Sequence, residues 1–229
     1  MAKLIWDQIG ERCYETGVEQ GAIYPMTGST YGPGEAWNGL TAVTESPSGA
    51  EATALYANNK KYGELQSAEE FGGTIEAYMY PDGFAECNGE KTIVKGFRAG
   101  QQVRKPFGMV YKTLIGNDTE GTKHGYVLHI VYNAKVKPSE KANNSINESP
   151  EAGTMSWEFT TTPVNIEGYD ASSHLTLRST EFETEEEIAK LKAVEEAFYG
   201  GESAEPKMLL PDEIKAILEG TENGEDPTE

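Results

Sequence analysis

Apolar and polar side chains alternate with a period of two over much of this chain, and this pattern most constrains its fold. Met155, Trp157 and Phe159 alternate with polar residues, as in a strand with one buried face. Residues 74–79 repeat the pattern, with the odd-numbered positions facing inward. Residues 125–134 are apolar on both faces apart from one histidine, which predicts a central strand covered on both sides.

Turn-forming residues separate the predicted strands at short intervals. They include Pro81-Asp82-Gly83, Asn88-Gly89 and residues 116–118, which are typical of tight connections. Further strands are expected at residues 12–18, 40–44, 92–97, 107–115 and 175–178. Many short strands with frequent turns predict a mainly β fold, organised as a sandwich or barrel.

Two connections are unusually long. Residues 25–39 are rich in glycine with interspersed aromatic residues, and residues 138–153 are polar and almost free of apolar side chains. Loops of this length in a compact domain are usually functional or disordered.

The hydrophobic period becomes helical after residue 180. A helix is predicted at about 184–199, where Thr184 and Glu187 form a capping box. A second helix is predicted at about 211–219, with Pro211 at its first position. We expect the first helix to pack on its own sheet. For the second helix, the sequence supports packing on the sheet and binding to a partner equally.

The acidic charge is concentrated in this C-terminal part. The chain carries a net charge of −19, of which residues 181–229 contribute −12. We therefore predict a β domain at 1–180 and an acidic helical extension at 181–229. A chain of this sign does not attract nucleic-acid phosphates or anionic membranes. We expect no membrane association, because no apolar run is long enough to span a bilayer and the N-terminus has no secretion signal.

The sequence contains no catalytic or ligand-binding motif. His124, His129 and His174 are far apart and have no metal-ligand spacing. We interpret His129 as a packed strand histidine rather than a ligand or base. Cys13 and Cys87 are interpreted as reduced, strand-borne side chains rather than a disulfide. The sequence thus indicates no catalytic, cofactor-binding or metal-binding residue, no cofactor, and no enzyme activity.

Two groups of side chains have both a functional and a structural interpretation. One is a loose basic cluster: Lys91, Lys95, Arg98, Arg104 and Lys105. We favour a solvated hairpin face, or ion-pair partners for a neighbouring subunit, over a nucleic-acid groove. The other is aromatic: Tyr24, Tyr31, Trp37, Tyr56 and Tyr62. It is consistent with an intersubunit contact surface, with a carbohydrate-stacking surface, or with ordinary core and rim aromatics.

Longer stretches carry a family resemblance. Residues 4–10 (LeuIleTrpAspGlnIleGly), 31–51 and 68–87 resemble the major tail (tail tube) proteins of long-tailed, non-contractile phages. The resemblance extends over most of residues 1–180, and is to the group common in phages of low-GC Gram-positive bacteria. It implies a β-sandwich or barrel with a flanking helix. It also implies hexameric rings whose inward strands form one barrel, stacked into a tail tube through which DNA passes.

The resemblance also implies partners and a location. The expected partners are further copies of the chain, and the tape-measure, tail-terminator and distal-tail proteins. DNA would cross the lumen without specific binding. The protein would reside in the virion tail, and in the host cytoplasm before assembly. By analogy, residues 1–11 and the two long loops would contact the next ring, and residues 138–153 would become ordered on assembly.

Moreover, two other functions agree with the sequence. One is a β-sandwich carbohydrate- or surface-binding module of a virion. The other is the tube protein of a related contractile tail or secretion system, because the resemblance implies a ring architecture that such tubes share.

Overall fold

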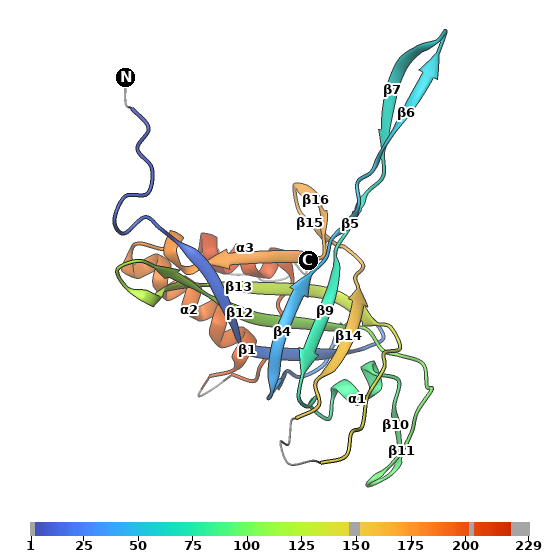
Figure 1. Cartoon of the computed structure of the whole chain (residues 1–229). Helices are drawn as coiled ribbons and strands as arrows, with labels where there is room; N and C mark the ends of the chain where they lie inside the picture. The colour runs from blue at the N-terminus through green and yellow to red at the C-terminus, as the bar shows by residue number, and fades with distance from the viewer. Residues whose placement is uncertain (1–2, 147–151, 202–203, 221–229) are drawn as a thin grey trace, which may run out of the picture.

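The computed structural model describes residues 3–146, 152–201 and 204–220 (Figure 1). The fold is mainly β, with antiparallel sheets and a few helices, which confirms the predicted fold class. Within these ranges no helix combines the length and the apolar character needed to cross a membrane.

One layer is a twisted antiparallel sheet, here called the helix-covered sheet. Its strands follow in the order β3 (Glu35–Ala36), β1 (Tyr14–Thr27), β12 (Phe107–Asn117), β13 (Gly121–Val136) and β17 (His174–Arg178), with β2 (Thr30–Tyr31) pairing with the end of β1. In β13 the six residues from 127 to 132 are all buried. The predicted central strand, covered on both sides, is therefore confirmed.

The second layer is the three-stranded sheet. It contains β4 (Leu40–Glu45), β9 (Gly72–Ala77) and β14 (Met155–Thr160) in the order β14–β9–β4. Strand β13 connects the two layers, because residues 127–131 pair with β17 whereas Lys135 and Val136 pair with the end of β14. The alternation predicted for β14 is confirmed, since all three of its apolar side chains are buried.

The space between the two sheets holds an aromatic core. Phe84 lies 4.6 Å from Trp37 and 5.2 Å from Trp157, measured between ring centroids. Phe84 belongs to the short helix α1 (Phe84–Cys87), which the sequence analysis did not predict. Complete burial of one such side chain stabilises a fold by about 1.5–3 kcal/mol, so this cluster holds the two sheets together.

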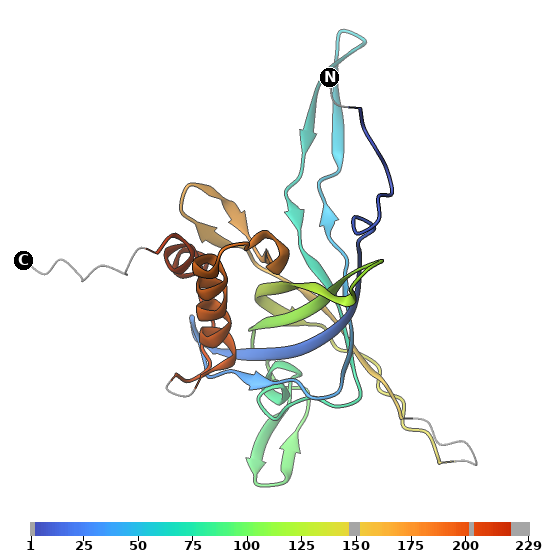
Figure 2. The same cartoon turned by 90° about the vertical axis from the view of Figure 1, so that its left-hand side faces the viewer.

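The C-terminal helices cover the other face of the helix-covered sheet (Figure 2). The 3₁₀ turn η1 (Ser179–Glu181) leads from β17 into α2 (Glu185–Tyr199), and α3 (Pro211–Glu219) follows. Val194 and Phe198 of α2 and Ile214 of α3 share one buried cluster with the sheet. Both helices thus pack on their own sheet, and residues 185–219 share a core with the β domain.

A long hairpin projects from one end of the molecule (Figure 1). It consists of β6 (Ala52–Ala57) and β7 (Lys60–Gln66), with β5 (Ser48–Gly49) and β8 (Glu69–Glu70) pairing at its base. Asn58 and Asn59 have φ angles of 49° and 61°, the left-handed conformation required in a tight hairpin turn. The sequence analysis did not predict this hairpin, although the Asn-Asn pair between two strand-like runs was its signal.

Two smaller hairpins flank the layers. The first consists of β10 (Lys91–Val94) and β11 (Phe97–Ala99), and the second of β15 (Val164–Ile166) and β16 (Tyr169–Ser172). The predicted single strand at 92–97 is wrong, because the chain reverses at Gly96, where φ is 82°. Residue 79 is also not part of a strand: β9 ends at Ala77 and the Met79 side chain is exposed.

Residues 25–39 are more ordered than a long loop. Strand β1 continues through Thr27, and β2 and β3 fall within the segment. Its backbone is also paired outside these strands, since the Trp37 amide donates to the Gly21 carbonyl. Residues 138–146 and 152–154 contain neither helix nor strand. The predictions for residues 1–2 and 147–151 lie outside the described residues.

The cysteines are both free, as expected. Cys13 is exposed and precedes β1, whereas Cys87 is buried in α1. Neither residue lies in a strand, so their predicted placement was wrong. Burial raises the pKa of the Cys87 thiol to about 12.

Candidate functional site

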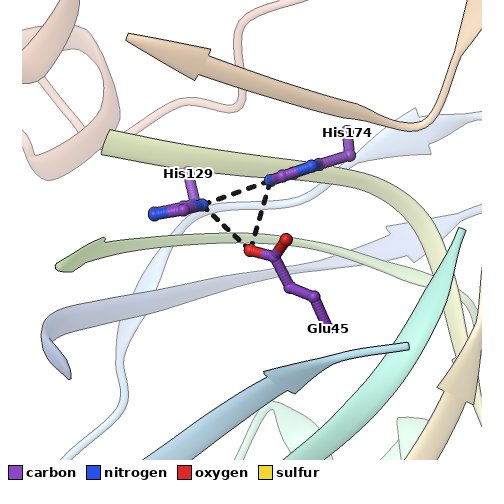
Figure 3. A group of neighbouring side chains, drawn as sticks. All are labelled: Glu45, His129 and His174. Atoms are coloured by element: carbon purple, nitrogen blue, oxygen red, sulfur yellow. Dashed lines mark hydrogen bonds and ion pairs between the residues drawn. The ribbon is translucent and has the colours of Figure 1, made fainter. Parts of the chain in front are cut away.

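Three polar side chains from three strands meet at one point (Figure 3). His129 lies in the middle of β13, and His174 is the first residue of β17. His174 pairs with Val131, two positions along the strand from His129, so the two imidazoles share one face of the sheet. Glu45, the last residue of β4, approaches from the three-stranded sheet.

The three side chains point toward a common centre (Figure 3). His129 Nδ1 lies 3.1 Å from Glu45 Oε1 and 3.3 Å from His174 Nε2. The third separation, between His174 Nε2 and Glu45 Oε1, is 3.7 Å. We refer to these residues as the His–His–Glu cluster.

Neighbouring side chains fix the orientation of each member. The His129 ring stacks on Tyr111 with a centroid distance of 4.6 Å, and the His174 ring stacks on Phe71 at 4.3 Å. The Tyr111 hydroxyl donates a hydrogen bond of 2.7 Å to Glu45 Oε1.

The second nitrogen of the His129 ring also has polar neighbours. His129 Nε2 lies 2.9 Å from Thr113 Oγ1 and 3.4 Å from Glu15 Oε1. These contacts hold the three side chains in place.

Burial and hydrogen bonding set the charge of the cluster. The hydrogen bond with His129 is the main cause that lowers the pKa of Glu45 to about 2, against an opposing effect of burial. Burial lowers the pKa of His174, while the nearby Glu45 carboxylate partly opposes this. Glu45 is therefore a carboxylate at neutral pH, and burial favours the neutral form of the His174 imidazole.

An open cavity of about 410 Å³ adjoins the cluster. Besides the three cluster residues, its lining includes Glu15, Thr113, Thr176 and Arg178. The Glu15 carboxylate offsets the Arg178 guanidinium, so the cavity wall is not strongly cationic.

Only part of this site is predictable from the sequence. His129 is a buried strand histidine, as predicted, but its proximity to His174 was missed because the two are brought together by the pairing of β13 and β17. The spacing of residues along the sequence does not show which strands pair with each other. His124 lies elsewhere, beside Glu120 and Asn117.

Part of the basic cluster is paired within the chain. Arg98 forms ion pairs with Asp82 and Glu90, and Lys105 pairs with Glu86. The charges of these two residues are thus neutralised within the chain.

The aromatic group does not form one surface. Tyr24 and Trp37 are core residues with 0% and 4% exposure, so for them the interpretation as ordinary core aromatics holds and a contact surface is excluded. Tyr56 and Tyr62 are exposed on the β6–β7 hairpin. Tyr31 is partly buried, so the hairpin pair is the fully exposed part of this aromatic group.

Exposed apolar side chains gather on two arms that project from the same end of the molecule (Figures 1 and 2). The arms are residues 3–13, here called the N-terminal arm, and the β6–β7 hairpin. Their exposed apolar residues are Leu4, Ile5, Trp6 and Ile9 on the first, and Leu55, Tyr56, Tyr62 and Leu65 on the second. Apolar patches exposed in this way are typical of interaction sites.

The opposite end of the molecule carries a second apolar group. The β10–β11 hairpin projects there (Figure 1) and exposes Ile93, Val94 and Phe97. The molecule thus has exposed apolar side chains at both ends, and the two groups face in different directions.

The three-stranded sheet has open edges. Among the described residues, no strand pairs with the outer edge of β4. At the other edge, β13 pairs with Phe159 and Thr160 of β14, and the Lys137 amide donates to the Glu158 carbonyl, so among the described residues only the start of β14, Met155–Trp157, has no strand beside it. Open edges present unpaired backbone groups that can pair with another chain.

Comparisons with known proteins give little further information. No family model matches the chain, and no curated protein is significantly similar to it. One solved structure with some similarity is a chain of the anti-feeding prophage baseplate, with 7% identity over 76% of this chain and 97% of that chain. Its TM-score of 0.37 is too low to support an argument about fold or function.

Proposed function

We propose that this protein is a structural component of a phage tail, whose copies form hexameric rings that stack into the tail tube. The observation that carries the proposal is the combination of open sheet edges with exposed apolar arms. In this proposal the chain resides in the virion after assembly in the host cytoplasm. Its partners are its own copies, and the tape-measure, tail-terminator and distal-tail proteins.

The open edges support closure of a ring. If β4 of one copy pairs with β14 of the next, each three-stranded sheet extends into its neighbour. Head-to-tail contacts of this kind close into a ring when the rotation between subunits permits it. Closure leaves no unpaired edge in the three-stranded sheets, which reduces the risk of uncontrolled strand addition there.

The faces of the three-stranded sheet support a water-filled lumen. Ile75 and Trp157 point into the core, whereas Glu76 and Glu158 lie on the opposite, polar face. In a ring this polar face would line the lumen, and the helix-covered sheet would lie outside it. Carboxylates on the lumen wall repel DNA phosphates, so DNA would pass without adhering.

The two ends of the molecule support stacking. The apolar arms project from one end, and the apolar β10–β11 hairpin projects from the other. Arms of one ring would therefore bury their exposed aromatic side chains against the opposite end of the next ring. Glu69 and Glu70 at the base of the long hairpin would approach Lys91 and Lys95 of the β10–β11 hairpin in the next ring.

Negative-stain electron microscopy of the concentrated protein tests the proposal. The expected result is rings or tubes, either alone or after addition of a preformed tail-tip complex as initiator. A protein that stays monomeric under both conditions would contradict the proposal.

A matched pair of variants tests the role of the arm. The double change Tyr56→Ser and Tyr62→Ser should shorten or abolish tubes while leaving the thermal unfolding midpoint almost unchanged. The control is Tyr169→Ser, because Tyr169 is equally exposed but lies on the β15–β16 hairpin. Equal tube lengths in the double variant and the control would exclude the hairpin from the stacking contact.

A further inference from the structure

We propose that the His–His–Glu cluster is a binding site for a divalent transition-metal ion of the zinc class, with Glu45 Oε1, His129 Nδ1 and His174 Nε2 as ligands. Two imidazoles and one carboxylate are a ligand set that zinc commonly uses. The proposal is independent of the proposed assembly, because all three ligands belong to one chain.

The distances between the ligand atoms fit a tetrahedral ion. With metal–ligand bonds of about 2.0–2.1 Å, tetrahedral ligand atoms lie about 3.3–3.4 Å apart. The three separations in the cluster are 3.1, 3.3 and 3.7 Å. A small movement of the half-exposed Glu45 side chain is enough to equalise them.

The surroundings provide the outer contacts that metal sites use. The nitrogen of His129 that faces away from the centre lies beside Thr113 Oγ1 and the Glu15 carboxylate. The ligating carboxylate accepts a hydrogen bond from Tyr111. Such outer-shell partners fix the tautomer and orientation of ligands and raise their basicity.

The position of the ligands indicates what an ion would do. Glu45 belongs to the three-stranded sheet, whereas both histidines belong to the helix-covered sheet. A bound ion would therefore join the two layers. Its fourth coordination position would face the adjoining cavity and take a water molecule or an anionic group.

Binding of Co²⁺ and Zn²⁺ to the full-length protein tests the inference, after metal is removed with a chelator. Co²⁺ should give the visible absorption bands of a low-coordinate site with one ion per chain, and Zn²⁺ should displace it. Zn²⁺ should also raise the thermal unfolding midpoint, because an ion that binds only the folded state stabilises it. Excess Mg²⁺ is present throughout, so that ordinary surface carboxylates are occupied.

Variants locate the site. Loss of an outer-shell partner alone typically weakens metal binding 10–100-fold, so Glu45→Gln and His174→Gln should each weaken Zn²⁺ affinity by at least about tenfold. His124→Gln is the matched control and should bind Zn²⁺ like the unchanged protein. Thermal unfolding of each metal-free variant verifies its fold.

Two results would overturn the inference. One is the absence of both the Co²⁺ bands and the Zn²⁺-dependent thermal shift in the unchanged protein. The other is equal loss of affinity in His124→Gln, which would place the ion elsewhere. The spectrum of the unchanged protein decides the question even if a cluster variant fails to fold.

Discussion

At the scale of single residues, close packing of backbones leaves no room for a side chain at Gly73. This residue lies on β9 between β4 and β14. A Cβ atom there would lie 2.2 Å from the Thr44 carbonyl oxygen and 3.0 Å from the Phe159 ring. The backbone oxygen cannot move away without breaking the sheet, so the site accepts glycine alone.

Replacement of Gly73 by alanine should therefore lower the free energy of unfolding. Overpacking of this kind costs roughly 1–3 kcal/mol, measured by urea unfolding followed through tryptophan fluorescence. The control is Gly63→Ala on β7, where no atom lies within 4 Å of the added Cβ. If both variants lose the same stability, the steric explanation is wrong.

Buried tyrosines make the fold sensitive to alkaline pH. Burial raises the pKa of Tyr24 and of Tyr132, and burial together with a hydrogen bond to Glu90 raises that of Tyr80 to about 12. Unfolded tyrosine ionises near pH 10, so the folded state binds more protons between the two pKa values. Stability is therefore complete below about pH 10 and decreases as the pH rises above it.

A combined titration measures this effect. Tyrosinate absorbance should rise in two stages, with the second coinciding with the loss of β-structure in circular dichroism. Complete ionisation of all tyrosines before any loss of structure would contradict the assignment of buried hydroxyls.

At the scale of elements, α2 begins where its sequence dictates. Thr184 Oγ1 accepts a hydrogen bond from the Glu187 amide, and Glu187 Oε2 accepts one from the Thr184 amide. The hydrogen bonds that the Glu187 carboxylate accepts, first from Thr184 and then from the Glu183 amide, lower the pKa of Glu187. Acidic residues in the first turn also interact favourably with the helix dipole.

Thr184→Ala should reduce the free energy of unfolding by about 1 kcal/mol, since it removes an N-cap acceptor. Urea unfolding measures the change. Thr53→Ala on the exposed face of β6 is the control, and a surface change of this type should stay within about 0.5 kcal/mol. A loss no larger than that of the control would show that the cap does not stabilise α2.

At the scale of the whole molecule, net charge opposes association of identical copies. Each chain carries −19, and neighbouring copies in a ring would repel each other. Salt screens this repulsion, because the Debye length falls from about 30 Å at 0.01 M to about 10 Å at 0.1 M ionic strength.

Assembly should therefore become faster and more complete as ionic strength rises from very low values. Light scattering at fixed protein concentration, with tube lengths from electron microscopy, measures the effect. A comparison of sodium sulfate with sodium chloride at equal ionic strength distinguishes screening of the charge repulsion from salting-out of the protein. Equal assembly at all ionic strengths would show that charge repulsion does not limit it.

The sequence by itself determined the β class, the central strand β13, and the start of α2. These features depend on local patterns: a period of two, an apolar run, and a capping box at Thr184 and Glu187. Each pattern acts within a few residues along the chain, so it is visible without tertiary information. The β6–β7 hairpin was equally local, and its Asn58-Asn59 turn was overlooked.

Only the tertiary structure decided which distant residues meet. The burial of Trp37 and Tyr24, the packing of α3 on the sheet, and the His–His–Glu cluster all depend on contacts between segments far apart in sequence. His129 and His174 come together through strand pairing, and Glu45 joins them because two sheets are stacked. The order in which the strands pair and the stacking of the two sheets result from burying the apolar surface of the whole chain. No local stretch of sequence encodes them.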